Sequence, residues 1–252
     1  MSIFDSIKLR ILQGDPIVHD VRGAKPPARF RAFPEVDPKA CAQGCDACVK
    51  VCPTNAITLN PLKIDLGKCV FCPACEIACP KKAIHFTNNY IMASTRREDL
   101  LVPGFAQSIT PEKASEKIRN YFGRSLKLRQ VSAGGCNGCE LELNALNNVN
   151  FDMGRFGIEF TASPRHADGI VITGPITKAM KNALDICYEA VPNPKIVILT
   201  GSCAISGGVF QESKETDRKF MEENKVDLYV PGCPPHPLTF ICGVLDFLGR
   251  KG

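Results

Sequence analysis

The second half of the chain alternates short aliphatic runs with longer amphipathic stretches. The aliphatic runs predict strands at residues 126–131, 158–161, 169–173, 195–200 and 227–230. The stretches among them, whose apolar residues recur at helical spacing, predict helices at residues 141–148, 177–190, 212–224 and 237–248. Strands that alternate with helices in this way are typical of a parallel sheet covered on both faces. We therefore predict an α/β domain over residues 125–252.

The first half of the chain shows weaker patterning. One short helix is predicted near the N-terminus, and its apolar face consists of Ile3, Phe4, Ile7, Ile11 and Leu12. This face favours docking on a neighbouring surface over direct contact with a membrane. Residues 23–34 are rich in proline and arginine and indicate an irregular linker. Thr110, which precedes a proline, marks the expected start of a helix that Gly123 would end.

Cysteine is the unusual residue in the composition, with 14 among 252 residues. The N-terminal residues lack the apolar core of a secretory signal, and no aliphatic run approaches the roughly 18 residues of a membrane span. Reduced, metal-binding thiolates are therefore favoured over disulfides. We accordingly expect a cytoplasmic location.

The net charge of +5 is modest and does not indicate nucleic-acid binding. Residues 81–130 hold ten Lys or Arg against four Asp or Glu, so the positive excess is concentrated there. A solvated face or a contact with an acidic partner explains this excess.

Residues 41–88 contain an internal repeat with an offset of 27 residues. The recurring pairs are Cys45 and Cys72, Cys48 and Cys75, Cys52 and Cys79, and Ala56 and Ala83. Such a repeat indicates duplication of a small cluster-binding unit. We therefore divide the chain into an N-terminal extension (1–32), a cluster-binding domain (33–92), a connector (93–124) and the α/β domain (125–252).

The spacing of these cysteines predicts two [4Fe–4S] clusters. The second run matches the bacterial pattern C-x2-C-x2-C-x3-C-P, whose fourth cysteine binds the other cluster in two-cluster proteins. The first run has one extra residue after its first cysteine, which a loop absorbs. We assign site 1 to Cys41, Cys45, Cys48 and Cys79, and site 2 to Cys52, Cys69, Cys72 and Cys75. Structural zinc is the alternative, but zinc sites usually use cysteine pairs with a long spacer.

Four further cysteines lie in Gly- or Pro-rich loops that follow predicted strands. They are Cys136, Cys139, Cys203 and Cys233. Loops after parallel strands meet at one edge of the sheet, and glycines let the backbone approach a bulky inorganic core. We therefore predict that the four converge as site 3, with zinc or unrelated thiols as the alternatives. Cys187 and Cys242 lie among apolar residues in predicted helices and are expected to be buried free cysteines.

These motifs resemble known families. Residues 41–88 resemble the bacterial-type 2[4Fe–4S] ferredoxin domain. Residues 126–250 resemble the small subunit of [NiFe] hydrogenases and, equally, the 20-kDa-type subunit of NADH–quinone oxidoreductase. The matching motifs are GCNGCE at 135–140, SPRHAD at 163–168, GSCA at 201–204 and VPGCPP at 230–235. The second resemblance implies a flavodoxin-like fold, a third [4Fe–4S] cluster on the site 3 cysteines, and an interface with a large subunit that holds the active site.

The first of these motifs favours one branch of that superfamily. The quinone-reducing branch typically has two adjacent cysteines there, whereas Cys136 and Cys139 are separated by two residues. The chain also lacks the Cys- and His-rich C-terminal extension of uptake hydrogenases. It is most similar to energy-converting, membrane-bound hydrogenases of the formate hydrogenlyase type. Those usually carry the ferredoxin unit on a separate chain, which is fused here.

The resemblance implies an electron-transfer subunit that relays electrons through three [4Fe–4S] clusters to a Ni–Fe site in a large subunit. No nickel is expected in this chain. The implied partners are that large subunit, membrane subunits, and a donor such as a ferredoxin or a formate- or CO-oxidising module. The chain would lie on the inner face of the cell membrane through its partners. The alternatives are a quinone- or sulfur-reducing complex without nickel, and a free-standing electron carrier or zinc-bound assembly factor.

Three polar residues of the family motifs are candidates for supporting roles. Glu140 would belong to a proton path or orient a cluster ligand, or else stabilise a helix N-terminus through the helix dipole. Arg165 and His166 would tune the third cluster or hold a loop or subunit interface. No catalytic residue is predicted in this chain.

Overall fold

A five-stranded parallel sheet forms the centre of the C-terminal half in the computed structural model, which describes residues 2–104 and 106–251. Its strands are β6 (Leu126–Ser132), β7 (Ile158–Phe160), β8 (Gly169–Thr173), β9 (Ile196–Thr200) and β10 (Leu228–Val230). They lie side by side in the order β10-β9-β8-β6-β7, and each neighbouring pair is parallel. This is the flavodoxin-like order, which confirms the predicted α/β fold.

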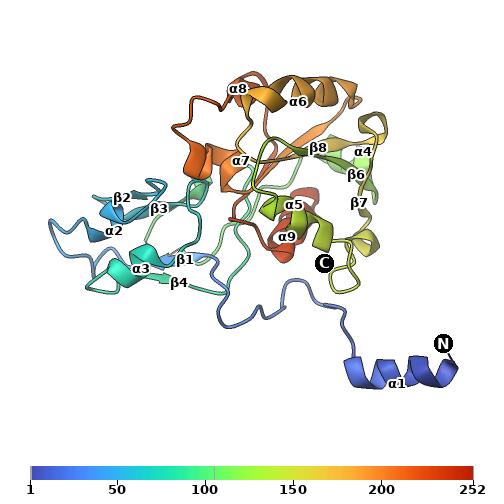
Figure 1. The fold of residues 1–252 in the computed structure, drawn as a ribbon, viewed down its shortest axis with the longest axis horizontal. Helices are drawn as coiled ribbons and strands as arrows, with labels where there is room; N and C mark the ends of the chain where they lie inside the picture. Colours follow the sequence, from blue (N-terminus) through green and yellow to red (C-terminus); the bar gives the residue numbers. More distant parts are fainter. Residues whose placement is uncertain (1, 105, 252) are drawn as a thin grey trace.

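Helices cover both faces of this sheet. They are α5 (Gly138–Ala145), α6 (Lys178–Ala190), α7 (Ser202–Ser206), α8 (Lys219–Glu223) and α9 (Pro237–Leu248), with short 3-10 turns η2 (Met153–Phe156), η3 (Pro164–His166) and η4 (Gly208–Phe210). Figure 1 shows α6 and α8 over one face and α5 and α9 over the other. Every residue of β8 and β9 is buried. Covering on both faces therefore explains why these strands read as continuous aliphatic runs.

The N-terminal half contains a small unit built from short elements. Its elements are β1 (Pro34–Val36), α2 (Ala47–Lys50), β2 (Ile57–Thr58), β3 (Lys63–Asp65), α3 (Ala74–Ala78), β4 (Ile84–Phe86), η1 (Glu98–Leu100) and β5 (Leu101–Val102). Strands β1 and β4 pair antiparallel, and β2, β3 and β5 form a second antiparallel sheet. Helices α2 and α3 pack together and begin 27 residues apart. The sequence repeat is therefore also a structural repeat.

The connector ties the two halves together. Its strand β5 completes the sheet of the N-terminal unit. Ser94 pairs with Tyr229 on the edge strand β10 through two backbone hydrogen bonds of 3.0 and 2.8 Å. One core cluster of buried side chains continues from the N-terminal unit to the α6 face of the sheet. The two halves consequently share a hydrophobic core.

Three predicted helices differ from the structure. The helix predicted at 141–148 is α5, which begins and ends three residues earlier, so Cys139 lies in its first turn and not in a loop. Residues 212–218 are not helical, and only Lys219–Glu223 forms α8. The amide of Lys178 instead donates to Glu215, and that of Asp217 donates to Ile176, so this segment bonds to a distant loop. The helix in the connector, α4 (Glu116–Phe122), begins after the N-cap Ser115 rather than at Thr110, although Gly123 does end it.

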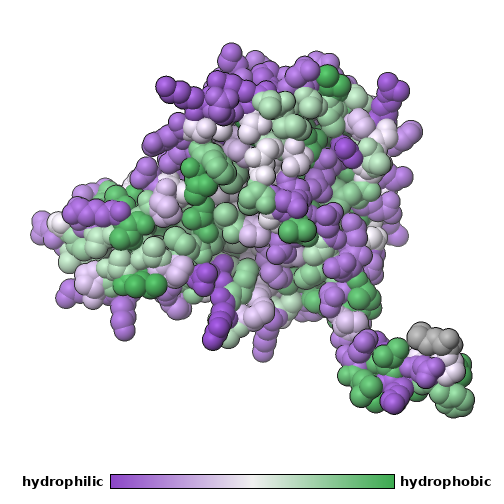
Figure 2. Space-filling model, viewed as in Figure 1, coloured by the Kyte–Doolittle hydropathy of each residue, from purple (hydrophilic) through white to green (hydrophobic). Residues whose placement is uncertain are grey.

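The N-terminal helix α1 (Ile3–Gln13) stands apart from the rest of the molecule (Figure 1). None of its residues is buried, and Phe4 and Ile11 are 78% and 76% exposed. Figure 2 shows apolar side chains over the surface of this helix at the lower right. Among the residues described, no helix is sufficiently long and apolar to cross a membrane.

Candidate metal centres

The four site 1 cysteines line one small cavity. Three of them come from the loop that leads into α2 and from α2 itself, and Cys79 comes from the end of α3. The amide of Ala83 donates to the Cys79 sulfur at 3.2 Å. Site 1 thus joins the first cysteine run to the last cysteine of the second.

The four site 2 cysteines line a matching small cavity. Here Cys52 comes from the first run, and its sulfur accepts from the amide of Ala56 at 3.3 Å. This contact repeats the one between Cys79 and Ala83 with the same offset of 27 residues. The structure therefore brings together the two crossed sets of cysteines that the sequence groups.

The four site 3 cysteines lie at the carboxyl edge of the parallel sheet. Cys139 lies in the first turn of α5, Cys203 lies in α7, and Cys233 follows β10. Burial raises the pKa of Cys139, and the charges of the other three site 3 cysteines add to the shift, because the four thiols are neighbours. Cys136 and Cys233 are exposed, so one side of this site is open.

A glycine makes close approach possible at site 3. Gly201 has a φ of +92°, and a Cβ built there would lie 2.5 Å from the Cys139 sulfur. Any larger residue would strain the backbone and displace that sulfur. The motif around Cys203 thus leaves room beside the cysteines, as a bulky cluster requires.

Burial opposes ionisation of several of these thiols. It raises the pKa of Cys75 to about 12 and that of Cys203 to about 11, with neighbouring cysteines adding to both shifts. Burial also raises the pKa of Cys69 and Cys139. A cationic iron centre would reverse this preference, because metal coordination deprotonates a thiol.

The donor sets fit [4Fe–4S] clusters. In the described part of the chain, no three His, Cys, Asp or Glu side chains come together closely enough to hold a single metal ion. The cysteines of sites 1 and 2 instead surround cavities, four around each. Four thiolates around one core are the usual ligand set of a [4Fe–4S] cluster.

Sites 2 and 3 lie next to each other. The hydroxyl of Ser202, beside Cys203, donates to the carbonyl of Cys69 at 2.5 Å. Burial raises the pKa of Cys233, and the charges of Cys136 and of Cys72 from site 2 add to the shift. Site 2 is therefore the N-terminal site that adjoins the C-terminal one.

Glu140 is buried directly beside site 3. Its Oε1 atom accepts hydrogen bonds of 2.6 Å from the hydroxyls of Ser132 and Thr173. Burial raises the pKa of Cys139 and of Cys203, and the charge of Glu140 adds to both shifts. The carboxylate also lies in the first turn of α5, so the two predicted roles are compatible in one position.

Arg165 and His166 lie on the surface turn η3, where neither is buried. Neither side chain makes a hydrogen bond or ion pair with another described residue. Cys242 is buried in α9, as expected, whereas Cys187 in α6 is partly exposed. Cys187 is therefore less buried than expected, because α6 packs against the sheet with only one face.

Sequence reasoning missed the residues that support the cysteines. Ser202 is 1% exposed, and Arg218 donates through its guanidinium to the carbonyls of Cys203, Ala204 and Ile205. In the sequence alone, neither a single serine nor a single arginine indicates a role beside a metal site. Ser202 was visible only as part of the GSCA motif, and Arg218 lies within a stretch that the pattern assigned to a helix.

Two family descriptions match the chain. Residues 136–247 match the NADH ubiquinone oxidoreductase 20 Kd subunit, and residues 40–83 match a 4Fe-4S dicluster domain. The first match contains all four site 3 cysteines, and the second contains all eight cysteines of sites 1 and 2.

Curated relatives come from several kinds of complex. The chain is 40% identical over 134 residues to the probable membrane-bound hydrogenase subunit mbhJ of Pyrococcus furiosus, covering 53% of this chain and 80% of the relative. It is 41% identical over 145 residues to formate hydrogenlyase subunit 7 of Escherichia coli, covering 57% and 55%. It is 43% identical over 114 residues to an NADH-quinone oxidoreductase subunit of Geotalea daltonii, covering 45% and 66%.

Proposed function

Because the chain belongs to the family of the NADH–ubiquinone oxidoreductase 20-kDa subunit, we propose that it is the electron-transfer subunit of a membrane-associated [NiFe] hydrogenase. The broader assignment, an iron–sulfur subunit of an oxidoreductase complex, follows from the family and from the dicluster match. The similarity to a membrane-bound hydrogenase subunit and to a formate hydrogenlyase subunit supports the more specific assignment to a [NiFe] hydrogenase.

The arrangement of the three cysteine sites carries this proposal. Sites 1 and 2 occupy the N-terminal unit, and site 2 adjoins site 3 through Ser202 and Cys69. The clusters, when bound, supply one-electron oxidation and reduction. The protein holds twelve cysteines in three groups, buries much of sites 1 and 2, and leaves site 3 open.

The open side of site 3 suits a partner that holds the active site. Cys136 and Cys233 are exposed there, and Leu141, two residues after Cys139, is 61% exposed. A large apolar side chain beside exposed cluster ligands fits a surface that another subunit covers. In the hydrogenase proposal, that subunit contains the nickel.

A second function is favoured by one observation. The chain is similar to an NADH-quinone oxidoreductase subunit nearly as strongly as to the hydrogenase subunits. A quinone- or sulfur-reducing complex would use the same three cysteine sites without nickel. The separation of Cys136 from Cys139 favours the hydrogenase.

The test is to purify the native complex without oxygen through a tag on this chain and to measure its nickel and iron. The proposal predicts nickel in the purified complex, together with a co-purifying large subunit. Leu141→Asp should lose that subunit, while Ile186→Asp, a similarly exposed change on α6, should retain it. Abundant iron without nickel would exclude the hydrogenase and favour the alternative.

A further inference from the structure

The short helix α7 contacts both of the adjoining cysteine sites. It carries Cys203 of site 3, and its first residue, Ser202, reaches site 2. The Ser202 hydroxyl lies 2.5 Å from the carbonyl of Cys69 and 3.1 Å from that of Gly232, which precedes Cys233. One buried hydroxyl therefore connects the loops of three proposed ligands.

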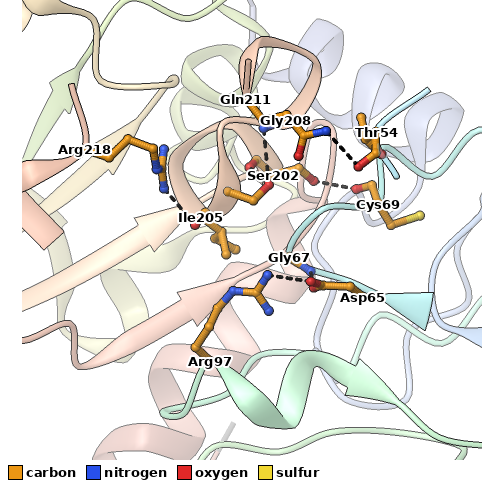
Figure 3. A network of polar contacts seen from close by, with 11 residues as sticks. Thr54, Asp65, Gly67, Cys69, Arg97, Ser202, Ile205, Gly208, Gln211 and Arg218 are labelled. Atoms are coloured by element: carbon orange, nitrogen blue, oxygen red, sulfur yellow. Dashed lines mark hydrogen bonds and ion pairs between the residues drawn. The ribbon is translucent and has the colours of Figure 1, made fainter. Parts of the chain in front are cut away.

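A second contact follows α7 in the chain. Gln211 donates through Nε2 to the carbonyl of Thr54 at 3.2 Å, two residues from Cys52. Figure 3 shows Ser202 and Gln211 pointing from the α7 region toward Cys69 and Thr54. The segment 202–211 thus bonds to both site 2 loops that approach the C-terminal half.

Arg218 holds α7 from the opposite end. Its guanidinium donates to the carbonyls of Cys203, Ala204 and Ile205 at 3.3, 2.8 and 2.8 Å. Figure 3 shows the contact with Ile205. The last carbonyls of a helix have no partners within the helix, and a cation there also favours the helix dipole. A single side chain therefore fixes the C-terminal end of α7.

An ion pair and close packing also hold the N-terminal unit at the interface with α7. Arg97 of the connector forms an ion pair of 2.7 Å with Asp65, which also accepts from the amide of Gly67 at 2.9 Å. A Cβ built on Gly67 would lie 2.8 Å from the side chain of Ile205 in α7. The loop that leads to Cys69 therefore packs directly against α7.

We propose that α7, clamped by Arg218, fixes site 2 against site 3, and that Ser202 is its positioning residue. This inference rests on the proposed electron-transfer function. Functional groups of this kind must be held to within about 0.5 Å, and hydrogen bonds to the ligands' own backbone provide such support. Ser202 acts through Cys69 and Gly232 and does not itself bind a cluster.

The test compares Ser202→Ala with Ser206→Ala in the full chain with its clusters. Ser206 lies on the same helix, but its hydroxyl bonds to Ser202 and Gly208, not to site 2. The readout is the magnetic splitting between the reduced clusters of sites 2 and 3 in electron paramagnetic resonance. A variant with Cys136→Ala and Cys139→Ala identifies that splitting, because it lacks site 3.

We expect Ser202→Ala to retain its iron, to lose part of this splitting, and to slow electron transfer between the two sites about tenfold. Ser206→Ala should match the wild type. Unchanged splitting in Ser202→Ala, even with a lower melting temperature, would overturn the proposal. If Ser202→Ala loses iron, Gln211→Ala becomes the deciding variant, and unchanged splitting there would overturn it. A wild-type chain without iron would refute the proposed function instead.

Discussion

Cys75 and Cys203 are thiols in surroundings that oppose their ionisation. Burial raises their pKa values to about 12 and about 11, so both hold their protons at neutral pH in the absence of iron. Cluster binding requires thiolates, so binding must release these protons. These proposed ligands therefore become thiolates only when iron binds.

This dependence predicts that iron is lost on acidification. Protons compete with iron for each thiolate, so iron retention should fall as the pH is lowered. The iron that remains bound after anaerobic incubation at each pH measures this. Cys242→Ala should give the same profile, because Cys242 also has a raised pKa, about 12, but belongs to no site. A profile independent of pH would contradict the proton competition.

Glu140 offers a second prediction at this scale. Its negative charge beside Cys139 and Cys203 favours the oxidised, less negative form of a cluster at site 3. Glu140→Gln should therefore raise the reduction potential of that cluster while keeping an acceptor for Ser132 and Thr173. A potentiometric titration followed by electron paramagnetic resonance measures the shift. The exposed Glu159→Gln is the control, and equal potentials in both variants would exclude this role.

At the scale of elements, the sequence pattern predicted those helices and strands whose bounds depend on residues within the same segment. The bounds predicted for β8 and α9 match the structure, because an aliphatic run and a proline-started apolar helix are encoded within their own segments. The first part of the helix predicted at 212–224 is absent, because the backbone of residues 215–217 bonds to residues 176–178. That pairing joins distant parts of the chain, so no local pattern reveals it.

The cysteine sites also have features that the local sequence predicts and features that depend on distant residues. Spacing predicted the crossed sets of sites 1 and 2, since each run forms one tight loop. Helix α7 was not predicted, because five residues are too few for a helical pattern. The role of Ser202 depends on Cys69, which lies 133 residues away in the chain.

Helix α1 makes a prediction of its own. Because none of its residues is buried, deletion of residues 2–13 should leave the melting temperature of the chain unchanged. The same deletion should reduce co-purification of partner subunits, since the apolar face is expected to dock on a neighbouring surface. Ile7→Asp, a single change on that face, should reproduce the effect. Equal recovery of partners by the truncated and full chains would refute this docking.

At the scale of the whole molecule, the three cysteine sites form a series. A shared hydrophobic core joins the two halves, and the connector pairs with β3 of the N-terminal unit and with β10 of the parallel sheet. Site 1 lies in the N-terminal unit, site 2 adjoins α7, and site 3 opens to the surface. Fusion of the two cluster-binding parts keeps them at a high effective concentration. We propose that this order guides electrons through the chain toward a partner at site 3.

The most direct test is the iron and acid-labile sulfide content of the anaerobically purified chain. Three [4Fe–4S] clusters predict about 12 iron and about 12 sulfide per chain. Replacing both Cys136 and Cys139 by alanine should lower each to about eight, because only site 3 is lost. Zinc in place of iron, or an iron content that this double variant leaves unchanged, would contradict the account.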